Sequence, residues 1–288
     1  MPATTGNGIT IEYETFGEPG APPVLLIMGF GCQLTMWDPL FCKALADAGF
    51  HVIRYDNRDV GLSTWLDDAG HPDLTDLLAG KATPPYSMSD MAADAAGLLD
   101  GLGLSSAHIV GVSMGGMIAQ TFAIEYPERT RSLVSIMSTT GDPTVGQPRP
   151  DALAALTASP PTTRDEAMDQ GATTWRIIGS PGYPFDESAV RERAGAAYDR
   201  AFHPAGNARQ LAAIIAQPDR TAALAQVTAP SLVIHGDADP LVDPSGGKAT
   251  AAAIPGAQLE LVAGMGHDLP SALIDELVTT LAHHFDRR

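Results

Sequence analysis

The chain has 288 residues, of which 44% are apolar and 18% charged, a composition typical of a globular protein and not of a disordered one. Acidic residues outnumber lysine and arginine by 34 to 17, which gives a formal net charge of −17. This charge argues against nucleic acid and anionic lipid as partners, because both would repel the protein. The length suits one large domain, or one domain that carries an insertion.

Residues 1–11 have neither the basic start nor the long apolar run of a signal peptide. The strongest apolar run, Val24–Met28, is too short to cross a bilayer, so we expect no membrane span. The two cysteines, Cys32 and Cys42, are too few for a disulfide framework. We therefore expect a cytoplasmic protein in which Cys32 is a small packing residue.

Strands and helices alternate along the first half of the chain. An antiparallel strand is predicted around Ile9–Tyr13, and continuous apolar runs predict buried strands at Val24–Met28, His51–Tyr55, His108–Val112 and Leu133–Met137. Helices are predicted at residues 39–48 after the cap Asp38, from the cap Ser89 to about Leu102, and at Met114–Tyr126 before Pro127. This order is typical of a mostly parallel sheet that helices cover on both faces.

Residues 138–226 break this alternation. They contain helical patterns at 151–158, 165–178, 187–201 and 207–216 but no convincing strand. The alternation then resumes with strands Ser231–His235 and Gln258–Val262 and with helices at 245–253 and 271–284. We therefore predict a core in two parts, residues 1–137 and 227–288, with a helical cap inserted at 138–226.

A candidate nucleophile lies between a predicted strand and a predicted helix, in the sequence Gly111-Val-Ser-Met-Gly115. In a G-x-S-x-G turn of this kind the serine hydroxyl stands clear of the sheet, and the flanking glycines allow the backbone to approach closely. The amide of Met114, at the start of the helix, is then placed to stabilise a developing oxyanion. The context predicts that Ser113 is the nucleophile of a hydrolase.

A serine needs a base to accept its proton. Among eight histidines, His267 lies in a glycine-rich loop just past the strand 258–262, where an imidazole can reach the nucleophile. The other histidines begin strands or lie in other loops, apart from three. We expect His235, at the end of a strand, to pack beneath the loop that follows, and His283 and His284, at the end of the last helix, to be solvated. Two carboxylates, Asp237 and Asp239, follow the strand 231–235, and either could orient the base.

The chain resembles the α/β-hydrolase superfamily over residues 24–137 and 227–288. The resemblance rests on Gly111-Val-Ser-Met-Gly-Gly116, Asp56-Asn-Arg-Asp-Val-Gly-Leu-Ser63, His235-Gly-Asp-Ala-Asp-Pro240 and Gly264-Met-Gly-His267. It implies that Asp239, before the proline, is the acid of a Ser, Asp, His triad. It also implies that the Phe30 amide is the second oxyanion donor, although the His-Gly that many members carry is Met28-Gly29 here.

More narrowly, the chain is similar to carboxylesterases of the aclacinomycin methylesterase type, which also lack that histidine. The similarity rests on Met28-Gly29, on His51-Val-Ile-Arg-Tyr-Asp56 and on the segment Trp175–Asp186. It implies hydrolysis of a small-molecule carboxylic ester through an acyl-enzyme on Ser113. Gly29, Trp175, Tyr183 and Phe185 are candidate substrate-binding residues, and Tyr198 and Phe202 are also available to line a pocket.

Other functions are excluded or stay open. Position 113 is serine, which excludes the aspartate nucleophile of the dehalogenases and epoxide hydrolases of the superfamily. Carbon–carbon bond hydrolases and cofactor-free perhydrolases or haloperoxidases use the same triad and stay as alternatives, as does a catalytically silent binding protein. The sequence contains no phosphate loop, dinucleotide fingerprint or metal-ligand pattern, so we expect neither a cofactor nor a metal. It leaves the oligomeric state open.

Overall fold

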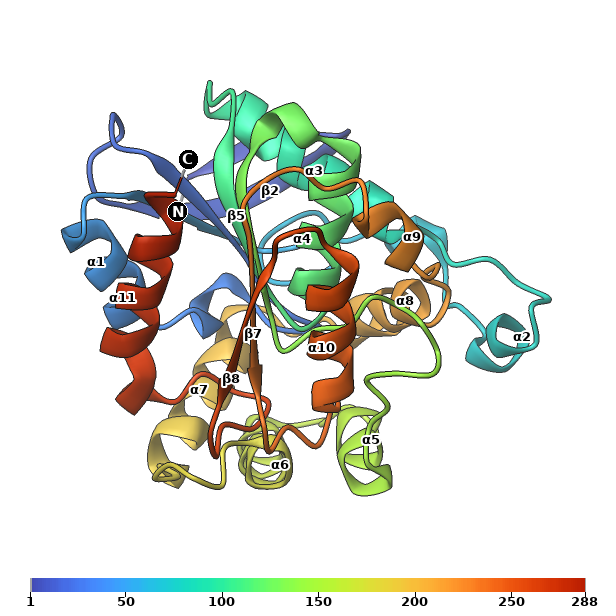
Figure 1. Ribbon diagram of the computed structural model, residues 1–288. Coiled ribbons are helices and arrows are strands. Elements are labelled where there is room, and N and C mark those ends of the chain that lie inside the picture. The colour runs from blue at the N-terminus through green and yellow to red at the C-terminus, as the bar shows by residue number, and fades with distance from the viewer. Residues whose placement is uncertain (1, 288) are drawn as a thin grey trace.

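A sheet of eight strands lies at the centre of the computed structural model, which describes residues 2–287 (Figure 1). The strands lie in the order β1-β2-β4-β3-β5-β6-β7-β8. The first two, β1 (Ala3–Gly6) and β2 (Ile9–Phe16), pair antiparallel, and the pairs from β4 to β8 are all parallel. The predicted mostly parallel sheet is therefore confirmed, while β1 was not predicted.

The strands beside the candidate site are buried on both faces, which explains their unbroken apolar runs. Every residue is buried in β3 (Pro23–Ile27), β4 (His51–Tyr55), β5 (Ala107–Val112) and β7 (Ser231–Gly236). The strand β6 (Thr130–Ile136) exposes one residue, Arg131, and β8 (Gln258–Val262) is partly exposed at the edge of the sheet.

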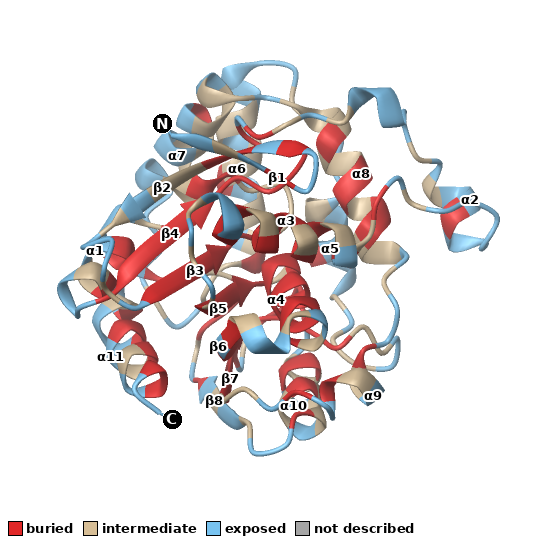
Figure 2. Ribbon diagram, turned by 90° about the horizontal axis from the view of Figure 1, so that it is seen from above, coloured by how far each residue is buried: buried red, intermediate tan, exposed pale blue. Residues whose placement is uncertain are grey.

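Helices cover both faces of the sheet, as Figures 1 and 2 show. On one face lie α1 (Pro39–Asp47) and α11 (Ile274–Phe285), and on the other lie α3 (Met88–Gly101), α4 (Met114–Glu125) and α10 (Pro244–Ala253). Each face has its own apolar core, so the sheet is held from both sides while its loops stay free for chemistry. Short 3₁₀ turns occupy Leu34–Met36, Asp67–Ala69, Pro127–Arg129 and Ser271–Leu273.

Local capping signals were interpreted correctly at α1 and wrongly at α3. The carboxylate of Asp38 accepts the Leu40 amide at 2.8 Å, as a helix cap does. The cap of α3 is Ser87 and not Ser89, because Ser87 and Asp90 form a reciprocal capping box. The prediction of a solvated His284 is also wrong, since its side chain packs into the core beside Phe285 and is 3% exposed.

Between β6 and β7 the chain forms five helices and no strand, all within the part that the structure describes. They are α5 (Pro150–Leu156), α6 (Arg164–Ile178), α7 (Glu187–Arg200), α8 (Pro204–Ile215) and the short α9 (Thr221–Leu224). We refer to residues 138–226 as the cap segment. Its separation from the core as a unit of its own stays a prediction.

Buried ion pairs hold the cap segment to the core. Arg209 of α8 donates both Nε and Nη2 to the carboxylate of Asp59, at 2.8 and 2.7 Å, and both side chains are almost fully buried. Arg200 of α7 pairs with the buried Asp56 at 2.8 Å. Removing one partner would leave a buried charge uncompensated, so these contacts fix where α7 and α8 lie.

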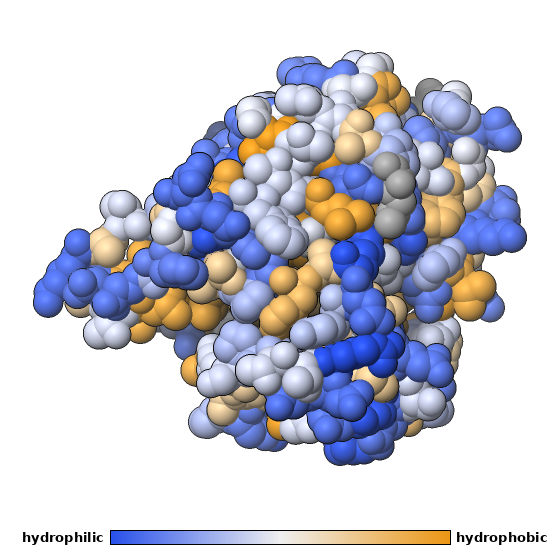
Figure 3. Space-filling view, turned by 180° about the vertical axis from the view of Figure 1, so that it is seen from behind, coloured by the Kyte–Doolittle hydropathy of each residue, from blue (hydrophilic) through white to orange (hydrophobic). Residues whose placement is uncertain are grey.

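An arm that carries α2 (Leu74–Leu78) projects from the body of the protein in Figure 1, and again at the left of Figure 3, with hydrophilic residues at its end. Its apolar residues Leu74 and Leu78 line the large cavity described below. Within residues 2–287, every helix is too short or too polar to cross a lipid bilayer.

Candidate active site

Ser113 lies at the sharp turn where β5 passes into α4. Its backbone has φ +55°, in the left-handed region that residues other than glycine rarely adopt. The surrounding backbone holds this strained conformation, since the Ser113 amide donates to the Ile136 carbonyl at 2.9 Å and its carbonyl accepts Ser138 Oγ at 2.8 Å. The turn thereby presents the hydroxyl at the C-terminal end of the sheet.

The glycines around Ser113 are required by close packing. A Cβ at Gly115 would lie 2.1 Å from the Ile27 carbonyl oxygen, and one at Gly111 would lie 1.9 Å from the Gly115 carbonyl oxygen. Only glycine lets α4 begin this close to β3 and β5. The G-x-S-x-G spacing therefore follows from the geometry of the turn.

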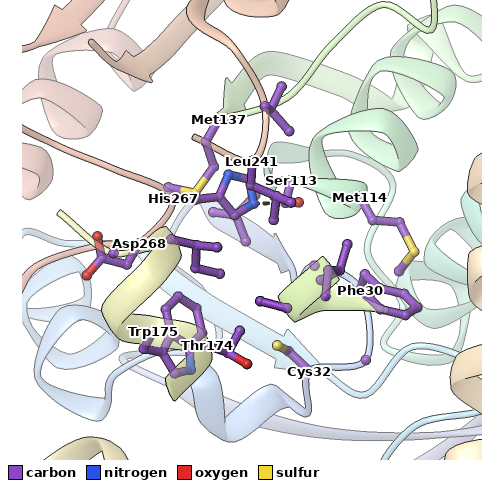
Figure 4. A pocket seen from close by; sticks show the side chains of 18 of the residues that line it. Phe30, Cys32, Ser113, Met114, Met137, Thr174, Trp175, Leu241, His267 and Asp268 are labelled. Carbon is purple, nitrogen blue, oxygen red and sulfur yellow. Dashed lines mark hydrogen bonds between the residues drawn. The ribbon is translucent and has the colours of Figure 1, made fainter. Parts of the chain in front are cut away.

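Two further side chains complete a continuous hydrogen-bonded chain with Ser113. His267 Nε2 lies 2.9 Å from Ser113 Oγ (Figure 4). On the other side of the ring, His267 Nδ1 lies 2.8 Å from Asp239 Oδ2. His267 is 5% exposed, and its backbone amide donates to the Ile178 carbonyl of the cap segment at 2.7 Å. An ionised Asp239 fixes the proton of His267 on Nδ1, which leaves Nε2 free to accept the serine proton.

The structure distinguishes between the two aspartates that could orient the base, Asp237 and Asp239. Asp239 is buried and contacts His267, and its Oδ1 accepts the amides of Leu241 and Val242 at 2.8 and 2.9 Å. Asp237 is exposed, and its Oδ1 accepts the Gly264 amide at 2.7 Å, within the loops that carry both residues. Asp239 is thus placed to orient the base, and Asp237 to hold a turn.

The electrostatic surroundings keep Asp239 ionised. Burial alone would raise the pKa of its carboxyl group, but the nearby His267 and the hydrogen bonds to Asp239 outweigh burial and hold that pKa well below its usual range. The contact between His235 and Asp239 was not predicted from the sequence. His235 Nε2 lies 2.8 Å from the Val242 carbonyl and 3.5 Å from Asp239 Oδ2, and because both neighbours are acceptors this nitrogen carries a proton.

The turn Met28–Gly31 lies against the nucleophile. A Cβ at Gly29 would be 3.2 Å from Ser113 Cβ, so a side chain here would press tightly against the nucleophile. Within residues 2–287, no protein group accepts a hydrogen bond from the amide of Phe30 or of Met114. The two predicted oxyanion donors are therefore available beside Ser113 to a bound group.

A cavity of about 1780 Å³ opens above the three side chains, between the core and the cap segment. All four predicted substrate-binding residues line it, namely Gly29, Trp175, Tyr183 and Phe185. Figure 4 shows Trp175 of α6 and Phe30 of the turn after β3 among the side chains that line the cavity. Most of the surface of the cavity is apolar, as expected for a pocket that takes an organic molecule of considerable size.

Of the remaining aromatic and thiol candidates, Phe202 and Cys32 line this cavity, while Tyr198 is not among its lining residues. Phe202 lines it and stacks on Tyr198, whose hydroxyl donates to the Thr162 carbonyl at 3.3 Å within the cap segment. Burial raises the pKa of the Cys32 thiol to about 11, partly offset by Arg193, so this thiol is neutral. Cys32 lines the cavity as an apolar group, and it also packs against the core, as expected.

No group of three or more histidine, cysteine, aspartate or glutamate side chains within residues 2–287 is placed to hold a metal ion. Ser113, His267 and Asp239 form one hydrogen-bonded chain of polar groups beside the cavity. This arrangement can transfer a proton away from a hydroxyl that attacks an electrophilic carbon.

Comparison with known proteins identifies the family. Residues 22–270 match the family described as alpha/beta hydrolase fold. The chain is 32% identical to rhodomycin D methylesterase DauP of Streptomyces sp. (strain C5) and 31% identical to rhodomycin D methylesterase DnrP of Streptomyces peucetius. Each alignment covers 97% of this chain and 96% of the relative.

Among solved structures, an enol-lactonase from Burkholderia xenovorans LB400 is similar, with a TM-score of 0.76 and 23% identity over 99% of this chain and 100% of that one. At this identity the likeness concerns the fold alone. The family match, by contrast, spans both parts of the core, and the two methylesterases align along nearly the whole chain. The chain therefore belongs to the α/β-hydrolase fold family, together with these carboxylic ester hydrolases.

Proposed function

We propose that this protein hydrolyses carboxylic esters through an acyl-enzyme on Ser113. The observation that carries the proposal is the unbroken chain of contacts from Ser113 through His267 to Asp239, with heavy-atom distances of 2.9 and 2.8 Å, at the floor of the cavity. Distances of this size suit the transfer of a proton from a nucleophile to its base. The full-length similarity to methylesterases supports an ester as the substrate.

In the first half of the reaction Ser113 Oγ attacks the ester carbonyl carbon while its proton passes to His267 Nε2. The amides of Phe30 and Met114 stabilise the negative carbonyl oxygen of the tetrahedral intermediate. The bond between the acyl carbon and the alkoxy oxygen then breaks, and His267 gives its proton to that oxygen, so that the alcohol leaves.

In the second half a water molecule attacks the acyl carbon and transfers a proton to His267 Nε2. The bond to Ser113 Oγ breaks, the serine regains the proton, and the carboxylic acid leaves. Asp239 keeps the imidazole oriented and stabilises its charged form in both halves. Carbon–carbon bond hydrolysis and perhydrolysis on the same three residues stay as the alternatives.

The size of the cavity leads us to propose methyl esters of bulky, largely apolar acids as the preferred substrates. The relatives are named as methylesterases of rhodomycin D, and the cavity of about 1780 Å³ has room for a large acyl group. Trp175 and Phe185 supply flat apolar surface on the cap side. This proposal assigns the cap segment the selection of the acid and leaves the chemistry to the core.

Methyl acetate, methyl phenylacetate and methyl pyrenylacetate should be hydrolysed with increasing kcat/KM. Their carbonyl groups are all attached to a CH₂ or CH₃ group, so their intrinsic reactivities are similar. Each further 100 Å² or so of buried apolar surface contributes about 2.5 kcal/mol, which corresponds to roughly 70-fold in kcat/KM. Initial rates of methanol release would measure the series, and a steady fall with acyl size would contradict the proposed substrate class.

The value of kcat/KM should rise with pH over the range in which the general base becomes neutral, because only a neutral imidazole accepts the proton of Ser113. The pKa of Asp239 is lowered, so this carboxylate is already ionised above the usual carboxyl range and does not cause the rise. The lowered pKa also makes the stability of the fold depend on pH. The stability that Asp239 contributes is fully present above the ordinary carboxyl pKa, and it is lost as the pH falls through the lowered pKa of Asp239. Measurement of kcat/KM from about pH 5 to about pH 9 checks the predicted rise in rate. A value that does not change with pH, in an enzyme that stays folded, would exclude His267 as the base.

A further inference from the structure

A glutamine of the cap segment contacts the turn that carries Phe30. Gln210, on α8, is fully buried, with its side-chain amide between two loops of the core. Its Oε1 accepts the amide of Gly31 at 2.9 Å, and its Nε2 donates to the Arg58 carbonyl at 2.9 Å. The side chain therefore uses one acceptor and one donor to tie the turn after β3 to the loop after β4.

Three consecutive peptide groups of this turn are held, each by a different partner. The Met28 carbonyl accepts Asn57 Nδ2 at 2.9 Å, the Gly29 carbonyl accepts the Cys32 amide at 3.3 Å, and the Gly31 amide donates to Gln210. In a trans peptide the C=O and N–H groups point in opposite directions. Fixing the Gly29 carbonyl thus directs the Phe30 N–H, the group left free beside Ser113, and the two flanking contacts prevent the peptide from turning.

The position of Gln210 is itself determined by the packing of α8. Gly31 has φ +66°, and a Cβ added there would lie 3.3 Å from Asn207 Nδ2, one turn earlier on the same helix. Arg209, the residue before Gln210, forms the buried ion pair with Asp59. The helix therefore contacts the turn directly and is anchored to the core at the same point.

We propose that Gln210 is a positioning residue for the oxyanion hole, acting through the Phe30–Gly31 peptide, and that the cap segment thereby supplies part of the catalytic machinery. The inference rests on the proposed function, in which the Phe30 amide stabilises the oxyanion. Asn57 and Gln210 then hold the turn from its two sides.

Gln210→Met should lower kcat by about 10- to 100-fold and change KM by less than about threefold. Methionine has nearly the length of glutamine but cannot make either hydrogen bond, so the Phe30 amide loses its fixed direction. Complete loss of one oxyanion donor costs about 10² to 10³ in kcat, and a donor that is misdirected for part of the time costs less. The bound ester depends little on this donor, which is why KM should change little.

A tetrahedral inhibitor separates this role from a merely structural one. Phenylboronic acid forms an adduct with an activated serine that places a negative oxygen in the oxyanion hole. Its inhibition constant should rise in Gln210→Met by about the same factor by which kcat/KM falls. An inhibition constant equal to that of the wild type, together with a reduced kcat, would overturn the inference.

Gln33→Leu is the matched control. Gln33 is also buried, and it also bridges core and cap, since its Nε2 donates to the carbonyls of Ala197 and Ala201, both at 2.8 Å. It makes no hydrogen bond to the turn residues 28–31. We expect this variant to have a lower melting temperature than wild type, with its kcat and its inhibition constant for phenylboronic acid within about threefold of the wild-type values. Equal losses of kcat in the two variants would contradict the inference, because they would show a general effect of loosening the cap segment.

Gln210→Glu keeps an oxygen that can accept the Gly31 amide, and its protonated carboxyl group can still donate to the Arg58 carbonyl, so it gives a second measurement should Gln210→Met fold poorly. It should retain more activity than the methionine variant, and an activity as low as that of Gln210→Met would count against the inference. The proposed function fails separately, if wild-type protein neither hydrolyses esters nor binds phenylboronic acid. An active wild type with an unaffected, folded Gln210→Met overturns the inference alone.

Discussion

Ser113→Ala should lower kcat for ester hydrolysis by about 10⁵- to 10⁶-fold, because nucleophile, base and acid act as a unit and the loss of the nucleophile removes the whole pathway. The substitution deletes one oxygen that bonds only to His267 Nε2, so folding should be unaffected. Rates of methyl phenylacetate hydrolysis by purified wild type and variant, with their melting temperatures, provide the test.

Turnover by Ser113→Ala close to that of wild type, with contaminating esterase excluded, would contradict the assigned nucleophile. Equal and negligible activity in both proteins, with tight binding of an ester to both, would favour the alternative of a silent binding protein. The ratio of wild-type to variant kcat therefore tests both the assigned nucleophile and the alternative of a binding protein.

Asp239→Asn should lower kcat by about 10⁴-fold with the fold retained, the scale seen when the acid of such a triad is neutralised. The side-chain oxygen of asparagine is needed by the amides of Leu241 and Val242, which now donate to Oδ1. Its NH₂ group would then face His267 Nδ1 and force the imidazole proton onto Nε2, where it blocks acceptance of the serine proton. Single-turnover kinetics at neutral pH measure the loss.

Asp237→Asn is the control for this prediction, since both aspartates follow β7. Asp237 is exposed and accepts the Gly264 amide, a contact that the oxygen of asparagine can keep. Its kcat should stay within about threefold of wild type, and its free energy of unfolding should fall by no more than about 1 kcal/mol. A large rate loss in this variant with Asp239→Asn almost intact would reverse the assignment of the acid.

The features that sequence could predict are those encoded in short stretches of chain. Ser113 is surrounded within a few residues by a buried strand, two glycines and a helix, so both its turn and its exposure follow from local sequence. The parallel sheet can also be predicted from local sequence, because strands that are buried on both faces need unbroken apolar runs such as Val24–Met28. The strand β1, Ala3–Gly6, has no such run and was missed.

The rest depends on contacts between distant parts of the chain. Gln210 meets Gly31 across 179 positions, and a glutamine in a predicted helix carries no sign of such a partner. His284 was expected at the surface because it ends a helix, but it lies on the face of α11 that packs against the sheet. Ser89 and Ser87 are both good caps, and only Asp90, three residues after Ser87, distinguishes them.

The central claim, that Ser113 is an activated nucleophile that becomes acylated, is tested most directly by a fluorophosphonate probe, which labels an activated serine and not an ordinary one. After labelling of the full chain, mass spectrometry of its peptides should find one adduct, on the peptide that contains Ser113. Labelling should disappear in Ser113→Ala and after preincubation with phenylboronic acid. Absence of labelling in active protein, or an adduct on another residue, would contradict the account.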